Sequence, residues 1–144
     1  MKKYKLGYTT GVFDLFHIGH LNILKRAKEQ CEYLIVGVST DELVMEYKNK
    51  KPVIPFEERK QIVEAIKYVD EVVSQENRDK VDALLRLKFN AMFVGDDWKE
   101  SPLFVETEKR FNGLGAQIIY LPYTKETSST LLKKNLIKIK SKEK

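Results

Sequence analysis

The apolar run Tyr33-Leu-Ile-Val-Gly-Val38 constrains the fold of this chain more than any other stretch. A strand that is apolar along its whole length must be covered on both faces, which is typical of parallel sheets. Four other short stretches share this character, at residues 4–9, 71–73, 91–94 and 117–121. The sequence therefore predicts a five-stranded parallel sheet.

Helical patterns separate these strands and predict a single α/β domain of the Rossmann-like kind, with helices on both faces of the sheet. They cover residues 18–30, 79–88 and 103–114, a stretch that begins at Pro55, and a last helix from about residue 128. Ser39, with Glu42 three residues later, predicts a helix cap directly after the second strand. Ile62 and Leu85 are expected on the inner faces of their helices. A polar, lysine-rich loop is expected over residues 47–55.

The formal net charge of +5 lies at the C-terminal end of the chain. Residues 133–144 hold six lysines against one glutamate, so the other 132 residues are neutral overall. A basic end of this kind is usually solvated. We therefore expect one domain over residues 1–136, a lysine-rich tail over residues 137–144, and no nucleic-acid partner.

The single cysteine, Cys31, excludes an internal disulfide and a cysteine-based zinc site. We expect it to pack at the end of the first helix. The apolar run near Met1 is too short for a secretory segment, and no stretch approaches the length of a membrane span. The expectation is a cytoplasmic protein that is not associated with a membrane.

The stretch Gly11-Val-Phe-Asp-Leu-Phe-His17-Ile-Gly-His20 stands where the first strand turns into the first helix. Because apolar residues recur at helical spacing directly after it, His17 and His20 should project from the first helical turn. The free N–H groups and the dipole at a helix N-terminus favour anions. The stretch predicts a phosphate site, with a plain polar helix start or a metal-binding histidine pair as alternatives.

Three further polar groups are expected at the same edge, because ligands bind at the carboxyl ends of parallel strands. They are the lysines at 48, 50 and 51 with Arg59, the stretch Gly95-Asp-Asp-Trp98, and the hydroxyl residues within 124–130. Cations, N–H donors and hydroxyls replace the water that a polyphosphate loses on binding. Each group alone fits a solvated loop, a turn or an N-cap, but together they predict a nucleoside triphosphate site.

The stretch from Gly11 to His20 resembles the HxGH signature of the nucleotidyltransferase superfamily. Three further matches narrow the resemblance: Lys48-Asn-Lys-Lys51 before Glu57-Glu-Arg59, Tyr68-Val-Asp-Glu-Val72, and Val94-Gly-Asp-Asp-Trp98. With these, the chain is similar along nearly its whole length to the glycerol-3-phosphate cytidylyltransferases.

This resemblance implies that CTP reacts with an alcohol phosphate, in the presence of Mg²⁺, to give a CDP-alcohol and pyrophosphate. It also implies a homodimer whose product feeds the synthesis of teichoic acid or another surface polymer. The acceptor favoured by the resemblance is sn-glycerol 3-phosphate. The alternatives are another alcohol or sugar-alcohol phosphate, ATP as the donor, or a regulatory module that binds the nucleotide without turnover.

Carried over residue by residue, the resemblance gives a catalytic set and a binding set, and no metal ligand. The catalytic set is His17, His20, Lys48 and Arg59. The binding set is Gly11, Val12, Phe13, Asp14, Lys50, Lys67, Asp97, Trp98, Thr124, Ser128, Ser129 and Thr130. The two histidines are expected to contact the CTP phosphates and to stabilise the transition state, and Lys48 to contact the acceptor.

The sequence departs from the family pattern at the phosphate end of the predicted site. The family's second motif usually begins Arg-Thr-Glu-Gly, whereas this chain has Tyr123-Thr-Lys-Glu126. A tyrosine thus replaces an arginine, and Lys125 supplies a point charge rather than a bidentate fork. Lys67 also stands where close relatives carry an arginine. Because of these departures, the resemblance does not decide which phosphorylated alcohol is the acceptor.

Overall fold

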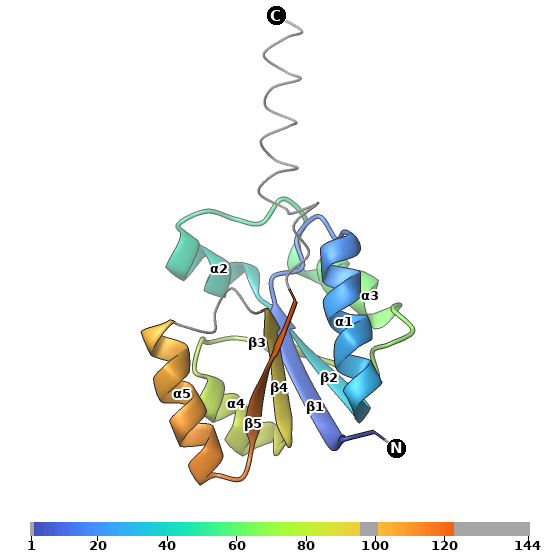
Figure 1. Ribbon diagram of the computed structural model, residues 1–144. Coiled ribbons are helices and arrows are strands. Elements are labelled where there is room, and N and C mark those ends of the chain that lie inside the picture. Colours follow the sequence, from blue (N-terminus) through green and yellow to red (C-terminus); the bar gives the residue numbers. More distant parts are fainter. Residues whose placement is uncertain (1, 96–100, 123–144) are drawn as a thin grey trace, which may run out of the picture.

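The computed structural model describes residues 2–95 and 101–122. In that part of the chain, five strands form one sheet in the order β3-β2-β1-β4-β5, and all neighbouring strands are parallel (Figure 1). The strands are β1 (Tyr4–Gly11), β2 (Cys31–Ser39), β3 (Glu71–Gln75), β4 (Ala91–Gly95) and β5 (Gln117–Leu121). The predicted five-stranded parallel sheet is confirmed.

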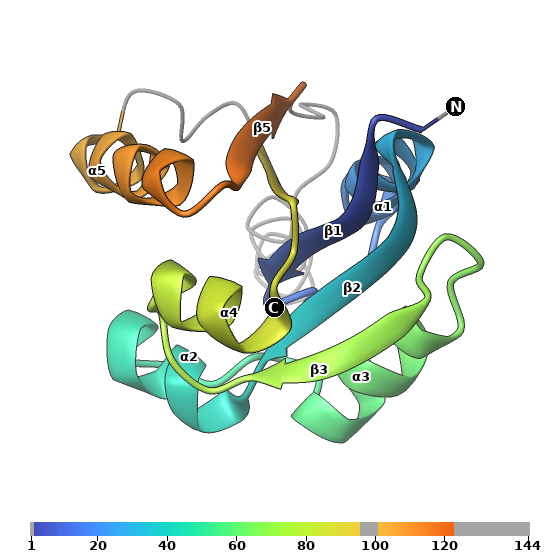
Figure 2. The same ribbon diagram turned by 90° about the horizontal axis from the view of Figure 1, so that it is seen from below.

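Helices cover both faces of this sheet, as the apolar strands require. They are α1 (Ile18–Gln30), α2 (Asp41–Lys48), α3 (Phe56–Glu64), α4 (Lys80–Leu87) and α5 (Pro102–Gly113). Both views place α1 and α3 on one face and α4 and α5 on the other (Figures 1 and 2). The α/β class with helices on both faces is therefore confirmed. None of the described helices is long and apolar enough to cross a membrane.

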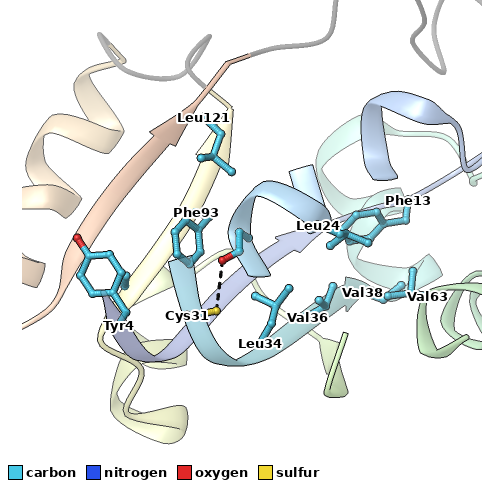
Figure 3. Packing of buried hydrophobic residues seen from close by; sticks show 12 residues of the cluster. Tyr4, Phe13, Leu24, Cys31, Leu34, Val36, Val38, Val63, Phe93 and Leu121 are labelled. Atoms are coloured by element: carbon cyan, nitrogen blue, oxygen red, sulfur yellow. Dashed lines mark hydrogen bonds between the residues drawn. The ribbon is translucent and has the colours of Figure 1, made fainter. Parts of the chain in front are cut away.

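Each face of the sheet has its own hydrophobic core. On the α1 side, Leu24, Leu34 and Phe93 are buried together, and the Cys31 thiol donates a hydrogen bond to the Ala27 carbonyl (Figure 3). On the α4 and α5 side, the ring of Tyr8 stacks on that of Phe89, with centroids 4.9 Å apart. The two cores explain why the central strands are apolar at successive positions, since neighbouring side chains enter opposite faces.

The helix that follows β2 begins one residue later than predicted. Ser39 ends β2, where it pairs with Gln75 of β3, and is therefore not the cap. The N-cap is Thr40, whose hydroxyl accepts a hydrogen bond from the Leu43 N–H at 3.2 Å. The helix runs on to Lys48, so the first two residues of the predicted lysine-rich loop, at 47 and 48, lie in its last turn.

Two predicted core positions are wrong. Ile62 is 42% exposed and Leu85 is 60% exposed. In α3, the inner face is taken by Arg59 and Val63, one helical turn apart, and this leaves Ile62 outside. In α4, Val81 and Leu84 are buried, so Leu85 points away from the sheet.

Candidate active site

A cleft of about 630 Å³ opens at the carboxyl edge of the sheet. Gly11, Ser39, Gln75 and Gly95, the last residues of the first four strands, all line it. The other lining residues are Thr9, Thr10, Val12, Phe13, His20, Ile23, Leu43, Tyr47, Lys48, Asn77, Arg78, Lys80, Met92, Val94, Leu103 and Phe104. The cleft lies at the edge at which the sequence predicts a nucleotide.

His17 and His20 cap α1 reciprocally. His17 is the N-cap residue, and its Nδ1 accepts a hydrogen bond from the Gly19 N–H at 3.0 Å. The Nδ1 of His20 accepts one from the N–H of His17 at 3.2 Å. Because a neutral imidazole that accepts through one nitrogen carries its proton on the other, both Nε2 atoms are donors. The cap therefore fixes the tautomer as well as the position of each ring.

Aromatic rings enclose His20. The rings of His17 and His20 stack with centroids 3.9 Å apart, and the Phe13 and Phe16 rings lie 5.4 and 5.2 Å from that of His20. Burial, with the neighbouring His17, lowers the pKa of His20 from 6.5 to about 4, although Asp14 acts in the opposite direction. Burial also lowers the pKa of His17. Both side chains therefore meet a ligand as neutral N–H donors.

This low pKa predicts that the stability of the protein depends on pH through His20. Its imidazole titrates near 6.5 when unfolded and near 4 when folded, so the unfolded state binds more protons between these pH values. The contribution is fully present above pH 6.5, and the free energy of unfolding should fall by about 2–3 kcal/mol as the pH drops to 4. Urea unfolding of the wild type and His20→Phe at several pH values measures this.

The His20→Phe variant keeps an aromatic ring at this position and cannot titrate, so its unfolding free energy should change less over the same pH range. Asp70 and His17, whose pKa values are also lowered in the fold, are present in both proteins and therefore contribute to both slopes. Equal slopes for the two proteins would contradict the assignment.

Asp14 links the segment between α2 and α3 to the segment that contains His17 and His20. Its carboxylate is buried, and its two oxygens accept hydrogen bonds from the backbone N–H groups of Val53 and Ile54 at 2.8 and 2.9 Å. These two hydrogen bonds show that Asp14 holds the backbone at Val53 and Ile54, a role that the sequence alone does not decide. Among the described residues, no group of three or more histidine, cysteine, aspartate or glutamate side chains could hold a metal ion.

Arg59 lies beneath the cleft, and its side chain is fully buried. Its guanidinium donates to the carbonyls of Ile54, Val12 and Ser39 at 2.7–2.8 Å, and to the Asp41 carboxylate at 2.6 Å. These partners come from three separate segments, which follow β1, join β2 to α2, and precede α3. In this structure Arg59 holds these segments together, and it is not among the residues that line the cleft.

The predicted lysines do not all reach the cleft. Lys48 lines it from the end of α2, and its Nζ lies 5.7 Å from the centroid of the Tyr47 ring. Lys50 is exposed beyond the helix and is not a lining residue. Lys67 is exposed in the connection that enters β3, at the amino edge of the sheet and away from the cleft of its own chain.

Gln75, Asn77, Arg78 and Lys80 line the cleft and are absent from the sequence-based prediction. The signal was available, because the polar run Gln75-Glu-Asn-Arg-Asp-Lys80 directly follows a predicted strand. The rule that placed the other polar groups at the carboxyl edge also applies to this run.

Several predicted site residues lie outside the described part of the chain. They are Asp97, Trp98, Thr124, Ser128, Ser129 and Thr130, together with the altered motif that starts at Tyr123. The described residues therefore bring Gly11, Val12, Phe13, His20 and Lys48 of the predicted set to the cleft, with His17 stacked on His20.

Comparison with known proteins identifies the family of the chain. The family model described as cytidylyltransferase-like matches residues 8–135. The glycerol-3-phosphate cytidylyltransferase of Bacillus spizizenii is 40% identical over 129 residues, which cover 89% of this chain and 94% of that protein. The FAD synthase of Pyrococcus abyssi is 38% identical over 114 residues, or 78% of this chain and 77% of that protein.

Solved structures share the fold. A lipopolysaccharide core biosynthesis protein from Thermoplasma volcanium superimposes with a TM-score of 0.70 at 25% identity, over 86% of this chain and 99% of that one. The pantoate-beta-alanine ligase of Francisella tularensis gives 0.62 at 17% identity, over 88% of this chain and 62% of that one. The second likeness shows the fold alone.

Proposed function

This chain belongs to the cytidylyltransferase-like family, and we propose that it transfers a cytidylyl group from CTP to sn-glycerol 3-phosphate, giving CDP-glycerol and pyrophosphate. The observation that carries the proposal is the reciprocal histidine cap, which leaves two neutral N–H donors at the start of α1, with His20 lining a cleft that Lys48 also lines. The enzyme is a nucleotidyltransferase, as its family indicates.

The proposed reaction needs no general base. A phosphate oxygen of the acceptor is already an anion at neutral pH, and it forms the new bond to the α-phosphorus of CTP. The bond from that phosphorus to the bridging oxygen breaks, and pyrophosphate leaves with the electron pair. Catalysis then consists of aligning the two phosphates and stabilising the charge on the α-phosphate oxygens.

In this scheme the histidines and Lys48 are the catalytic residues. The Nε2–H groups of His17 and His20 donate to the α-phosphate, and Lys48 neutralises charge between donor and acceptor. The strand end at Gly11, with Val12 and Phe13, forms the wall against which the nucleotide lies. Arg59 and Asp14 act as positioning residues, because their polar atoms bind the backbone around the cleft.

Mg²⁺ enters this proposal as part of the nucleotide substrate. The described residues supply no cluster of metal ligands, and both oxygens of Asp14 accept backbone hydrogen bonds. We assign the ion to the CTP phosphates, as the resemblance implies. The predicted triphosphate contacts at Ser128, Ser129 and Thr130 stay a prediction.

The compartment, the oligomeric state and the pathway that we propose follow from the same resemblance. We propose a cytoplasmic homodimer that supplies CDP-glycerol for a surface polymer such as teichoic acid; the names of the relatives support the glycerol 3-phosphate substrate. The size-dependent elution of the purified protein tests the oligomeric state. The predicted lysine-rich tail over residues 137–144 lies outside the described residues.

A panel of two nucleotides and several acceptors tests the function. We expect pyrophosphate release from CTP with glycerol 3-phosphate to exceed that from every other pair, because the relatives that cover 89% of the chain are glycerol-3-phosphate cytidylyltransferases. ATP with flavin mononucleotide belongs in the panel, since FAD synthases also match. Phosphorus NMR of the product identifies the new diphosphate. No turnover of CTP with any phosphorylated alcohol would refute the proposal, and tight CTP binding without turnover would favour a regulatory module.

A further inference from the structure

We propose that Tyr47, at the end of α2, is a positioning residue that holds Lys48 at the cleft through a stack between its ring and the Arg78 side chain. This inference rests on the proposed function, in which Lys48 is a catalytic residue. Tyr47 belongs neither to the set of residues that the resemblance supplies nor to any of the motifs that carry it. Tyr47, Lys48 and Arg78 all line the cleft.

In the last turn of α2, Tyr47 is the side chain that packs against the rest of the domain. Met45, Glu46 and Lys48 are exposed, whereas Tyr47 is half-buried. Tyr47 lies one helical turn after the buried Leu43, on the same face, and both side chains line the cleft. A helix of eight residues is marginal on its own, so its tertiary contacts decide where the last turn lies.

The pairing of β2 with β3 brings Tyr47 to Arg78. These two parallel strands pair as far as Ser39 and Gln75, so the segments that follow them leave the sheet side by side (Figure 2). The N–H of Thr40 also donates a hydrogen bond to the Gln75 carbonyl at 3.1 Å. α2 follows the first segment, and Arg78 lies on the second. The Tyr47 ring therefore meets a side chain from a connection that the sheet itself holds.

Two cations lie against the Tyr47 ring. The guanidinium carbon of Arg78 is 4.5 Å from the ring centroid, and the Nζ of Lys48 is 5.7 Å from it. Because the face of an aromatic ring is negative, it attracts cations and offsets part of the repulsion between them. The stem of a lysine is flexible, so a contact near the ammonium restricts where the charge lies. The ring thus supports the Lys48 ammonium directly.

The hydroxyl of Tyr47 has partners within the protein. Burial raises the pKa of this hydroxyl, whereas the Arg78 charge, a side-chain hydrogen bond with Ser39 and the Arg59 charge act in the opposite direction. The hydroxyl is therefore linked to the end of β2 and stays protonated at neutral pH. Since the ring contacts cations and the hydroxyl contacts Ser39, the geometry assigns Tyr47 to holding Lys48 and not to the reacting atoms.

The connection that follows α2 is held separately at its other end, where Asp14 accepts hydrogen bonds from the N–H groups of Val53 and Ile54. Lys48 lies at the α2 end of this connection, where Tyr47 makes its contacts. A displacement of about 1 Å can cost about a hundredfold in rate when a reaction depends on alignment. Loss of the Tyr47 ring is therefore expected to act on catalysis through Lys48.

The experiment is a double-mutant cycle between Tyr47→Leu and Lys48→Met. With Lys48 present, Tyr47→Leu should lower kcat/KM for pyrophosphate release about tenfold, within the range of a cation–π contact. In the Lys48→Met background, the same change should cost less than about twofold, since no ammonium remains to be held. Tyr47→Phe keeps the ring and should retain most of the wild-type rate.

Tyr33→Leu is the matched control, because this tyrosine of β2 is 41% exposed and does not line the cleft. It should leave kcat/KM as in the wild type. An equal loss from Tyr47→Leu in both backgrounds would mean that Tyr47 acts on the substrate without Lys48, and it would overturn the inference. A wild-type rate for Tyr47→Leu with Lys48 present would overturn it as well.

Binding separates this inference from the proposed function. If the protein turns over no acceptor, the same cycle is measured in the Kd for CTP with Mg²⁺ by calorimetry, which needs no turnover. A loss of affinity from Tyr47→Leu that occurs only when Lys48 is present supports the positioning role although the proposed function fails. Equal changes in Kd in both backgrounds, or none, overturn it. If the protein turns over CTP but the two losses in kcat/KM are equal, the positioning role is wrong and the function stands.

Discussion

The His20→Ala variant is expected to lose about 100- to 1000-fold in kcat/KM, by analogy with the loss of one oxyanion donor at about 3–4 kcal/mol. The Nε2–H of His20 is the donor at stake, and its half-buried, capped ring lines the cleft. Because the ring is neutral, the loss should be the same at pH 6 and at pH 8 once the titration of the acceptor phosphate is taken into account. Steady-state rates of pyrophosphate release measure it.

The His17→Ala variant should show a comparable kinetic loss with an added cost in stability. His17 is the N-cap of α1, and replacing a capping side chain by alanine costs about 1 kcal/mol. Lys25→Ala, at an exposed position of the same helix, is the control and should leave kcat/KM as in the wild type. Rates within a few-fold of the wild type in either histidine variant would show that the cap is structural only.

The positions of the histidines could be predicted, but their tautomers could not. The spacing of apolar residues after the first strand predicts a helix over residues 18–30, and α1 has these bounds in the structure. The prediction succeeds because the apolar face of the helix and its polar N-terminus are both local signals. That each Nδ1 accepts from a backbone N–H depends on the geometry of the first turn. The sequence therefore indicated an anion site, and the fold shows that two neutral donors form it.

The inner face of α3 shows why other parts of the site escaped prediction. A periodicity argument assigns buried positions to apolar residues, so it put Ile62 inside and left Arg59 for the ligand. In the fold, Arg59 is buried because three segments, at Val12, at residues 39–41 and at Ile54, place carbonyls and the Asp41 carboxylate around it. Such a set of partners has no local signature. The polar run at residues 75–80 was not predicted for a different reason, since none of the motifs that carry the resemblance includes it.

The largest expected effect on stability is that of Arg59→Met. The side chain is fully buried, so its removal leaves the Val12 and Ser39 carbonyls and the Asp41 carboxylate without their donor. The Asp41 side chain is 33% exposed, so most of the cost comes from the carbonyls; acceptors left without a partner cost about 1–3 kcal/mol each, which puts the total at about 3–5 kcal/mol. For a chain of this size, that loss lowers Tm by roughly 10–15 °C. Thermal unfolding followed by circular dichroism measures the change, and a transition within 2 °C of the wild type, about what a surface pair yields, would contradict the role.

Arg86→Met is the matched control, because it removes an arginine from a pair with Asp82 that is 49% and 40% exposed. An exposed pair of this kind contributes about 0.3–0.5 kcal/mol. Arg59→Lys separates charge from shape: it keeps the cation but loses the planar fork that meets four acceptors at once. We expect Arg59→Lys to fall close to Arg59→Met in stability. If instead the lysine variant is as stable as the wild type, the charge alone holds the three segments. The guanidinium geometry that joins the end of β1, the β2–α2 junction and the segment before α3 is then not required.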